Sequence, residues 1–372
     1  MAHEGRSVVI PHQLRVARES LELSLSQVAD ALGMEPKDLA NWESGISEPP
    51  VERLWDLGEF YNRSTDYFLT PTPSLPAELS FRLPRWKAMG EMPLDVRRVF
   101  VRFDELCRTE SELEKLLGKS RRILAERVSG DWSPNQLATK ERKRLGLDEK
   151  PIPDLRGLLR NQGIRIFALP VAGDELSGLS WWHEEYGPCI LLNARDTAGR
   201  RLFTLAHEYA HLLRSDPPTV CNLKMDIPEE RFATEFAAFF LMPASDLEGY
   251  FLKWVGHPGR VPDDKELGRL ATRYHVSLEA VGRRLEELGL IPEGTTNSRI
   301  VEWEAKPRGY RGRRGPKWQR QLGEQFVSLA LEAHSEGHIS VSKLAEYFGV
   351  DLRKVVEVVQ ELREPGVMRK DA

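Results

Sequence analysis

The sequence predicts an α+β protein that is mostly helical and contains more than one domain. Apolar residues recur three or four positions apart through most of the chain, which is the spacing of one face of a helix. Only three short apolar runs, at residues 164–169, 178–183 and 189–193, have the length and composition of strands. The chain length of 372 residues suggests two or three domains.

The N-terminal region predicts a group of short helices. An amphipathic helix starts near Leu14, and a second helix covers Ser24–Gly33, with a serine cap at its start and a glycine stop at its end. A third covers Glu35–Gly45, and Pro49–Pro50 opens a further helix. Short helices joined by a tight turn at Gly33 are typical of helix-turn-helix packing.

This region resembles the XRE or Cro-like helix-turn-helix family over residues 11–69. The resemblance rests on Ser26–Gly33, which reads S-Q-V-A-D-A-L-G, followed by W-E-S-G and a proline. It implies a five-helix DNA-binding domain at residues 1–70, which would read palindromic sites as a homodimer. Four residues would then contact DNA: Gln27 at the phosphate backbone, and Pro36, Lys37 and Asn41 at base edges. The alternative is that the fold serves dimerisation or docks a repressor of the same fold.

Residues 71–150 are predicted to be a linker and connecting helices. Thr70–Pro76 is rich in proline and is typical of a stiff linker. From Val96 to about Val128 the apolar residues again fall mostly three or four apart, which predicts one or two helices. We expect their apolar positions to be core.

A small sheet is expected next. Leu155–Gly163 predicts a helix with a glycine stop, and the chain then enters a strand over Ile164–Leu169. Two more strands, Gly178–His183 and Cys189–Asn193, flank a turn at Tyr186–Pro188. An extended peptide could align on this hairpin by strand addition.

The segment Thr204–Leu213 carries the clearest chemical signal, His-Glu-x-x-His. In a helix, His207 and His211 lie one turn apart on one face, so both imidazoles can reach one ion. Glu208 lies at the edge of that face, where a carboxylate can activate water. Chance produces this motif in roughly 3% of chains of such composition. The alternative is a structural histidine cluster without metal.

A hydrolytic zinc site needs a third protein ligand. The next helix is predicted to begin at Pro228 and to end before Pro243, with acids in its first turn. Glu230 lies far enough beyond the two histidines for a loop and a return helix, and Glu229 and Glu235 are its rivals. Spacing alone leaves the choice among these three open.

These two segments resemble the ImmA/IrrE family of zinc metallopeptidases. The resemblance rests on Arg200–His211 and on Glu230–Pro243, which reads E-x-x-A-x-x-F-A-x-x-x-L-M-P, and it covers residues 150–290. It implies a zincin-like peptidase domain of the gluzincin type at residues 151–292, in which Glu230 is the third zinc ligand. Thr234 stands where the family usually has asparagine.

Two further helices are predicted between Leu267 and Leu288, and by resemblance they close the peptidase domain. Catalysis by such a domain also calls for a donor that stabilises the tetrahedral oxyanion. The candidates, which the sequence does not rank, are Tyr250, His257, Arg214 and His275.

Residues 293–372 predict a basic linker and a small helical module. Lys306–Lys317 is basic and rich in glycine, so it either contacts a nucleic-acid backbone or is a solvated linker. Three short helices are predicted from Trp318 to Leu362. Ser340–Val350 has the spacing of a helix-turn-helix, and we assign its apolar positions to the core.

The composition limits the class of protein. A net charge of −4, with both signs mixed, excludes a polycation that binds nucleic acid over its whole surface. Cys107, Cys189 and Cys221 are few, odd in number and widely spaced, which argues against a disulfide framework and for the cytoplasm. No secretory signal or apolar run of about 18 residues is present, so we expect no membrane partner.

Together these features predict a DNA-binding, zinc-dependent endopeptidase. By resemblance, Zn²⁺ is the cofactor and the substrate is a protein, either a repressor or another regulator, cleaved in a stress or mobile-element response. The alternative is a transcription regulator or antitoxin-like protein that binds DNA and whose zincin domain senses a ligand.

Overall fold

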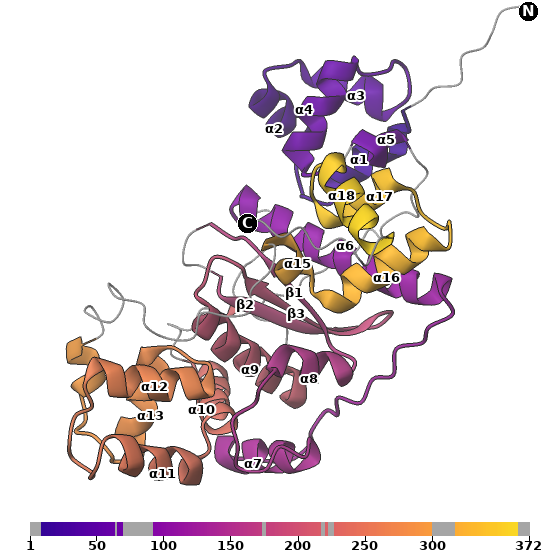
Figure 1. Ribbon diagram of the computed structural model, residues 1–372. Helices are drawn as coiled ribbons and strands as arrows, with labels where there is room; N and C mark the ends of the chain where they lie inside the picture. Colours follow the sequence, from indigo (N-terminus) through magenta and orange to yellow (C-terminus); the bar gives the residue numbers. More distant parts are fainter. Residues whose placement is uncertain are drawn as a thin grey trace, which may run out of the picture. The chain divides into compact units, whose positions relative to one another are not determined.

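The computed structural model describes residues 9–63, 65–69, 92–172, 176–216, 220–221, 227–299 and 317–363 (Figure 1). The chain separates into two compact units, residues 1–106 and 107–372. The described residues are mostly helical and include one small sheet, which confirms the predicted fold class. None of their helices is long and apolar enough to cross a membrane. Two predicted segments, the linker at 70–76 and the basic stretch at 306–316, lie outside the described residues.

The described part of the first unit contains five short helices before the long helix α6, in agreement with the prediction. They are α1 (Pro11–Glu19), α2 (Leu25–Leu32), α3 (Pro36–Glu43), α4 (Val51–Tyr61) and α5 (Thr65–Leu69). Ser24 caps α2, and Gly33 ends it in the left-handed conformation with a φ of 60°. The helices enclose one core, formed by Leu14, Val28, Leu39, Leu57 and Phe68.

The helix α6 (Leu94–Leu116) is shorter than the predicted helical region. Apolar spacing continues to Val128, but the chain leaves the helix near Gly118, whose φ is 64°. Further on, the backbone N–H of Val128 donates to the carbonyl of Leu213 at 2.7 Å. Residues 119–133 are not helical, and their apolar side chains only mimic helical spacing.

The second unit is built on a mixed sheet with the strand order β1-β3-β2-β4. Its strands are β1 (Arg165–Leu169), β2 (Gly178–His183), β3 (Gly187–Asn193) and the short β4 (Val220–Cys221). β1 and β3 are parallel, whereas β2 is antiparallel to both β3 and β4. The first three strands confirm the prediction. The reversal between β2 and β3 lies at residues 184–186, slightly earlier than predicted, and β4 was not predicted.

Helices cover both faces of the sheet (Figure 1). On one face, α9 (Ala198–Arg214) packs against β2 and β3, with α8 (Leu155–Asn161) beside it. On the other, Phe326 of α16 (Glu324–Ser335) meets Phe167 of β1, with ring centroids 5.5 Å apart. Every residue of β1 and β3 is buried, as expected for strands covered on both faces.

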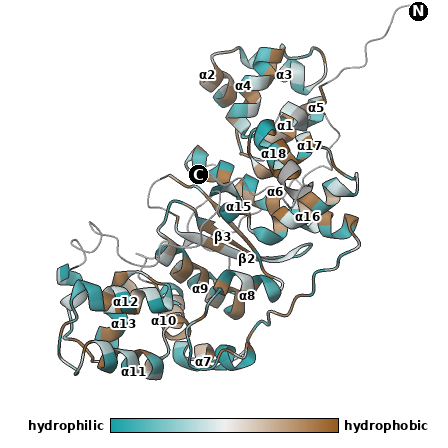
Figure 2. Ribbon diagram, in the orientation of Figure 1, coloured by the Kyte–Doolittle hydropathy of each residue, from teal (hydrophilic) through white to brown (hydrophobic). Residues whose placement is uncertain are grey.

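Five further helices belong to the part of the unit that lies beyond the α9 face. They are α7 (Pro134–Arg144), α10 (Pro228–Leu241), α11 (Ala244–Trp254), α12 (Asp264–Tyr274) and α13 (Leu278–Glu287). α10 packs against both α9 and α7. The sequence did not predict α7, which is mostly hydrophilic, whereas α9 contains many hydrophobic residues (Figure 2).

The C-terminal module has four described helices rather than the predicted three. They are α15 (Lys317–Leu322), α16, α17 (Val341–Phe348) and α18 (Leu352–Arg363). Gly323, with a φ of 88°, separates α15 from α16, which explains the extra helix. Two arginines of α8 tie the module to the sheet: Arg156 donates to the carbonyl of Gln321 and Arg160 to that of Leu322.

A buried cluster of charges joins α6 to the sheet. Glu110 of α6 is fully buried and lies 2.9 Å from Arg160 Nη1 and 3.1 Å from Arg165 Nη1. Arg121 also contacts Glu110, at 3.2 Å. Burial alone would raise the pKa of Glu110, but the three arginines outweigh it and lower the pKa to about 2.

We expect the free energy of unfolding to depend on the charge of Glu110. Its pKa is lower in the folded protein than the ordinary value of 4.5, so its contribution is fully present above that pH and is lost as the pH falls toward about 2. In urea unfolding at neutral pH, Glu110→Gln should lose about 3 kcal/mol. Its free energy of unfolding should also fall less steeply between pH 4.5 and about 2 than that of the wild type.

The matched control is Glu185→Gln, because Glu185 forms an exposed ion pair with Lys115 at 3.3 Å. This variant should lose less than about 1 kcal/mol. Equal losses in the two variants would contradict the role given to the buried cluster.

Candidate functional site

α9 places the His-Glu-x-x-His residues in the interior of the second unit. His207 and Glu208 are 0% exposed and His211 is 5% exposed. The helix ends at Ser215, which adopts the left-handed conformation with a φ of 58°. This turn sends the chain back toward the helix, and the backbone N–H of Asp216 donates to the carbonyl of His211.

α10 contributes one of the three glutamates that the sequence left open. Glu230 is 1% exposed and shares the buried face of the helix with Ala233 and Ala237. Glu229 and Glu235 are exposed. The phase of the helix therefore brings Glu230, and neither of its two rivals, to the histidines.

The donor atoms of His207, His211 and Glu230 converge on one point. His207 Nε2 lies 3.1 Å from Glu230 Oε2 and 3.2 Å from His211 Nε2, and His211 Nε2 lies 3.6 Å from Glu230 Oε1. Ligands of a tetrahedral zinc ion lie about 3.3 Å apart, because Zn–N and Zn–O bonds are about 2.0–2.2 Å long. Both the kind of donor and the spacing fit a tetrahedral metal ion such as zinc.

The second ring nitrogen of each histidine has a partner of its own. His211 Nδ1 lies 2.9 Å from Asp216 Oδ2, and His207 Nδ1 lies 3.3 Å from Thr234 Oγ1. Such contacts fix the orientation of the rings and leave each Nε2 directed at the common point. Sequence reasoning missed Asp216, whose position depends on the turn at Ser215, and noted Thr234 only as a departure from the family pattern.

The pKa values of the two histidines move in opposite directions. Burial lowers the pKa of His207 despite its hydrogen bond with Glu230, which favours the neutral imidazole that binds metals. Burial also opposes charge on His211, but the hydrogen bond with Asp216 and the charges of Glu208 and Glu230 outweigh it and raise the pKa. Protons therefore compete with a metal ion more strongly at His211 than at His207.

Glu208 lies in a narrow space between α9 and β2. A Cβ atom at Gly178 of β2 would lie 2.5 Å from Glu208 Oε1 and 2.7 Å from Thr204 Cγ2, so only glycine allows this close approach. β4 pairs with Gly178 and Leu179 at the same place. An extended peptide could therefore add to β2 only beyond Leu179 or by displacing β4.

In the first unit, the four residues predicted to contact DNA lie on α2 and α3. Gln27 and Lys37 are exposed, and Pro36 and Asn41 are half-buried. Gln27 also takes part in the capping box of α2, where its Oε1 accepts a hydrogen bond from the backbone N–H of Ser24.

The acidic residues of α3 do not all face outward. Glu43 is buried and accepts two hydrogen bonds from Arg18, at 2.8 and 2.7 Å. Glu35 and Asp38 remain exposed. The outer surface of α3 therefore carries less negative charge than its sequence suggests.

Comparison with known families covers both regions. Residues 14–68 match the family model described as helix-turn-helix, and residues 159–286 match the one described as IrrE N-terminal-like domain. The chain joins a helix-turn-helix domain to an IrrE N-terminal-like domain. The first is a DNA-binding domain and the second is metallopeptidase-like, which confirms both resemblances. No curated protein sequence matches the chain.

Among the oxyanion candidates, Arg214 has contacts that lead to the cluster of the IrrE N-terminal-like domain. Its Nε lies 3.6 Å from Asp216 Oδ1, so one carboxylate joins it to His211. Its guanidinium also lies over the ring of Phe232 on α10, 4.1 Å from the centroid. Arg214 therefore lies at the edge of the cluster, held by α9 and α10.

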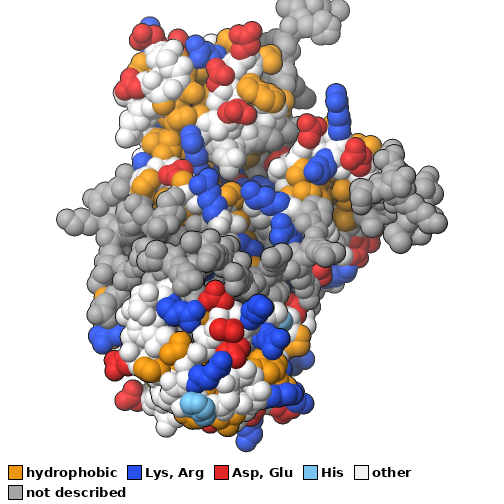
Figure 3. All heavy atoms as spheres, turned by 60° about the vertical axis from the view of Figure 1, so that its left-hand side comes forward, with side chains coloured by type: hydrophobic (Ala, Val, Ile, Leu, Met, Phe, Trp, Pro, Cys, Tyr) orange, Lys and Arg blue, Asp and Glu red, His pale blue; other side chains and the backbone are white. Residues whose placement is uncertain are grey.

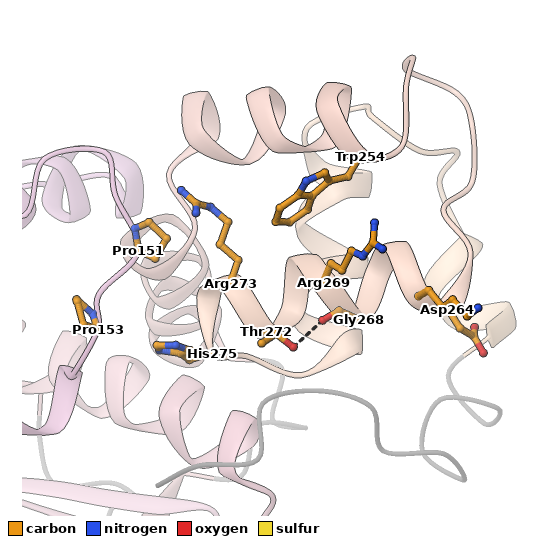
Figure 4. Close-up of a pocket in the computed structure, with 10 residues that line it drawn as sticks. Pro151, Pro153, Trp254, Asp264, Gly268, Arg269, Thr272, Arg273 and His275 are labelled. Carbon is orange, nitrogen blue, oxygen red and sulfur yellow. Dashed lines mark hydrogen bonds between the residues drawn. The ribbon is translucent and has the colours of Figure 1, made fainter.

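The other three candidates make their contacts elsewhere. The ring of Tyr250 lies 4.8 Å from that of Trp254 at an interplanar angle of 60°, and Arg273 lies over the Tyr250 ring at 3.5 Å. His257 is exposed. His275 lines a separate cavity of about 780 Å³ with Trp254 and Arg273 (Figure 4).

The surface over α11, α12 and α13 mixes basic and acidic side chains, with no continuous field of one sign on the face shown (Figure 3).

The neighbouring glutamates of α10 give a matched pair of variants for the metal site. Glu229→Gln should retain about one zinc ion per chain. Glu230→Gln should lose it, because an amide is a far weaker ligand than a carboxylate. Asp216→Asn should weaken zinc affinity about 10- to 100-fold. Elemental analysis and chelator competition measure these effects, and equal zinc content in the two glutamate variants would show that Glu230 is not a ligand.

The close approach of β2 to Glu208 at Gly178 can be tested by urea unfolding with a second matched pair of variants. Gly178→Ala should push β2 away from Glu208 and cost about 1–3 kcal/mol in urea unfolding. Gly249 of α11 is the control, because a Cβ there meets no atom within 4 Å. Gly249→Ala should be neutral or should stabilise by up to about 1 kcal/mol. If Gly178→Ala is also neutral, the space beside Glu208 is not as tight as described.

Proposed function

We propose that the protein is a zinc endopeptidase that binds DNA and cleaves a regulatory protein. The observation that carries this proposal is the buried cluster of His207, His211 and Glu230, with Glu208 on the same helix. Asp216 and Thr234 contact the Nδ1 atoms of His211 and His207 and so orient both rings with their Nε2 atoms toward one point. This arrangement is typical of a metal site. A histidine cluster that only stabilised the fold would not need both Nε2 atoms to point at one position.

The residues of the cluster have distinct roles in this proposal. The two histidines and Glu230 would hold zinc, which when bound would supply the Lewis acidity that polarises a peptide carbonyl and lowers the pKa of water. Glu208 accepts the proton of the attacking water and delivers it to the amine nitrogen of the leaving peptide. Arg214 is the donor best placed to stabilise negative charge on the carbonyl oxygen, because Asp216 holds it at the edge of the cluster.

We propose that the first unit contacts DNA through the residues predicted for this role. Gln27 would bind the phosphate backbone, while Pro36, Lys37 and Asn41 would face base edges. Lys37 and Gln27 are exposed, which supports the assignment. A homodimer of such domains would read a palindrome.

Binding to DNA also favours a particular substrate. A peptidase held on an operator meets any protein bound beside it at a high effective concentration. The substrate class that this arrangement favours is a DNA-bound repressor, whose cleavage would change transcription during stress or the activation of a mobile element. Cys107 and Cys189 are buried and form no disulfide, which fits the reducing cytoplasm, where such a repressor works.

The test of peptidase function is the Glu208→Gln variant. It should retain zinc and DNA binding, because the amide has nearly the shape of the carboxylate and Glu208 is not a ligand. Cleavage should fall by about 100-fold or more, because the amide cannot accept the proton of water. The readout is the set of new protein N-termini in cells that express each form, identified by mass spectrometry, which detects cleavage of any cellular protein.

Glu229→Gln, an exposed change close to the cluster, serves as the control and should produce the same new N-termini as the wild type. Identical N-termini from the wild type and Glu208→Gln would contradict the proposed peptidase activity. If zinc and DNA binding were intact in that case, a regulator with a sensing zincin domain would be the better description.

A further inference from the structure

The C-terminal module repeats the geometry of the helix-turn-helix in the first unit. α2 and α17 each have 8 residues. The connection before them has the same length in both places, at Ser20–Ser24 and Glu336–Ser340, and so does the turn after them, at Gly33–Glu35 and Gly349–Asp351. The two segments therefore align without a gap from the end of the first helix to the start of the third.

The residues that begin and end the middle helix are the same in both copies. Ser24 and Ser340 each accept a hydrogen bond at 3.1 Å from the backbone N–H three residues further on. Gly33 and Gly349 both end the helix in the left-handed conformation, with φ of 60° and 61°. The same capping residues and the same backbone conformation after the helix therefore occur at both places in the chain.

The buried positions also correspond. Three pairs of residues at matching positions are at most 1% exposed: Ala17 and Ala333, Val28 and Leu344, and Leu39 and Val355. Even a polar contact is repeated, since Arg18 donates to the carbonyl of Leu23 and His334 approaches the carbonyl of Ile339 at 2.9 Å. α17 and α18 thus repeat the lengths, caps, turn and buried positions of α2 and α3, and they pack against each other as α2 and α3 do. The preceding helix packs differently in the two places, because α1 contacts mainly α3 whereas α16 contacts mainly α17.

In a helix-turn-helix, the N-terminal part of the third helix enters the major groove. The corresponding part of α18 presents exposed side chains suited to this position, namely Leu352, Arg353, Lys354, Val356 and Glu357. Arginine can read guanine, glutamate can accept a hydrogen bond from cytosine, and an apolar side chain can contact the methyl group of thymine. Leu352 is 46% exposed and Val356 38% exposed, so much of each apolar side chain lies outside the core of the module.

We propose that α16, α17 and α18 form a second helix-turn-helix that binds duplex DNA, with α18 in the major groove. Arg353 and Glu357 lie at the positions of Lys37 and Asn41 and read base edges, while Lys343, at the position of Gln27, lies beside the phosphate backbone. Because the exposed residues of α3 and α18 differ, one chain reads a site with two different halves. This proposal does not depend on peptidase activity.

The experiment uses the full-length protein and a pool of DNA duplexes with a long random core. Enriched sequences are compared for the wild type, for Arg353→Glu/Lys354→Glu and for Lys37→Glu/Asn41→Ala. The wild type should enrich two different short motifs. Each double variant should lose one motif and keep the other, and anisotropy with the enriched duplex should show binding about tenfold weaker or more.

Two controls distinguish the loss of base recognition from a general loss of positive charge and from unfolding of the variants. Lys143→Glu reverses an exposed charge on α7 and should leave both motifs and the affinity unchanged. Unchanged unfolding temperatures should show that the surface variants fold. Any binding by the basic sequence at 306–317 depends on charge and not on base sequence, so it would not change a motif.

The proposal is overturned if the α18 variant enriches the same motifs with the same affinity as the wild type. That result would assign the exposed residues of α18 to a protein partner instead. It is also overturned if Lys143→Glu weakens binding as much as the α18 variant, because the effect would then reflect total charge alone.

Discussion

The burial of four ionisable side chains at the crossing of α9 and α10 is the constraint on which the second unit depends. His207, Glu208, His211 and Glu230 are almost completely withdrawn from solvent, and each would destabilise the fold without compensation. Compensation requires donor atoms about 3 Å apart, so the two helices must pass close to each other. Small residues allow this: Ala206 and Ala210 on α9 and Ala233 and Ala237 on α10 are all buried.

Further buried polar contacts hold this crossing in place from outside. Glu141 of α7 accepts a hydrogen bond from Tyr209 of α9, and Arg142 donates to the carbonyl of Phe240 on α10, so the hydrophilic α7 contacts both helices. On the opposite face of the sheet, Glu110 and its arginines fix α6 and β1. Such contacts rigidify a fold because each charge tolerates only one arrangement of its partners. A metal site benefits directly, since its affinity depends on ligands held in place before binding.

The sequence predicted the parts of the site that depend on local geometry. His207 and His211 share a face in any helix, so their pairing does not depend on the tertiary fold. Which glutamate of α10 joins them depends on how that helix is rotated against α9, a tertiary property that spacing could not supply. Asp216 escaped notice because its position follows from a left-handed residue at Ser215, and serine rarely signals that conformation. Helix α7 escaped because only Leu137 and Ala138 form the apolar part of its buried face, and the charged residues Glu141 and Arg142 form the rest.

The proposed second helix-turn-helix bears on how the proposed peptidase would select its substrate. One helix-turn-helix on one half-site binds weakly, and symmetry is the usual remedy, as two copies read a palindrome. A chain with two different modules can instead gain affinity from its own second site, since the linked event is intramolecular. It then binds an asymmetric sequence and has a defined direction along the DNA. A peptidase bound in one direction meets only proteins on one side of it, so the DNA site itself would contribute to the choice of substrate.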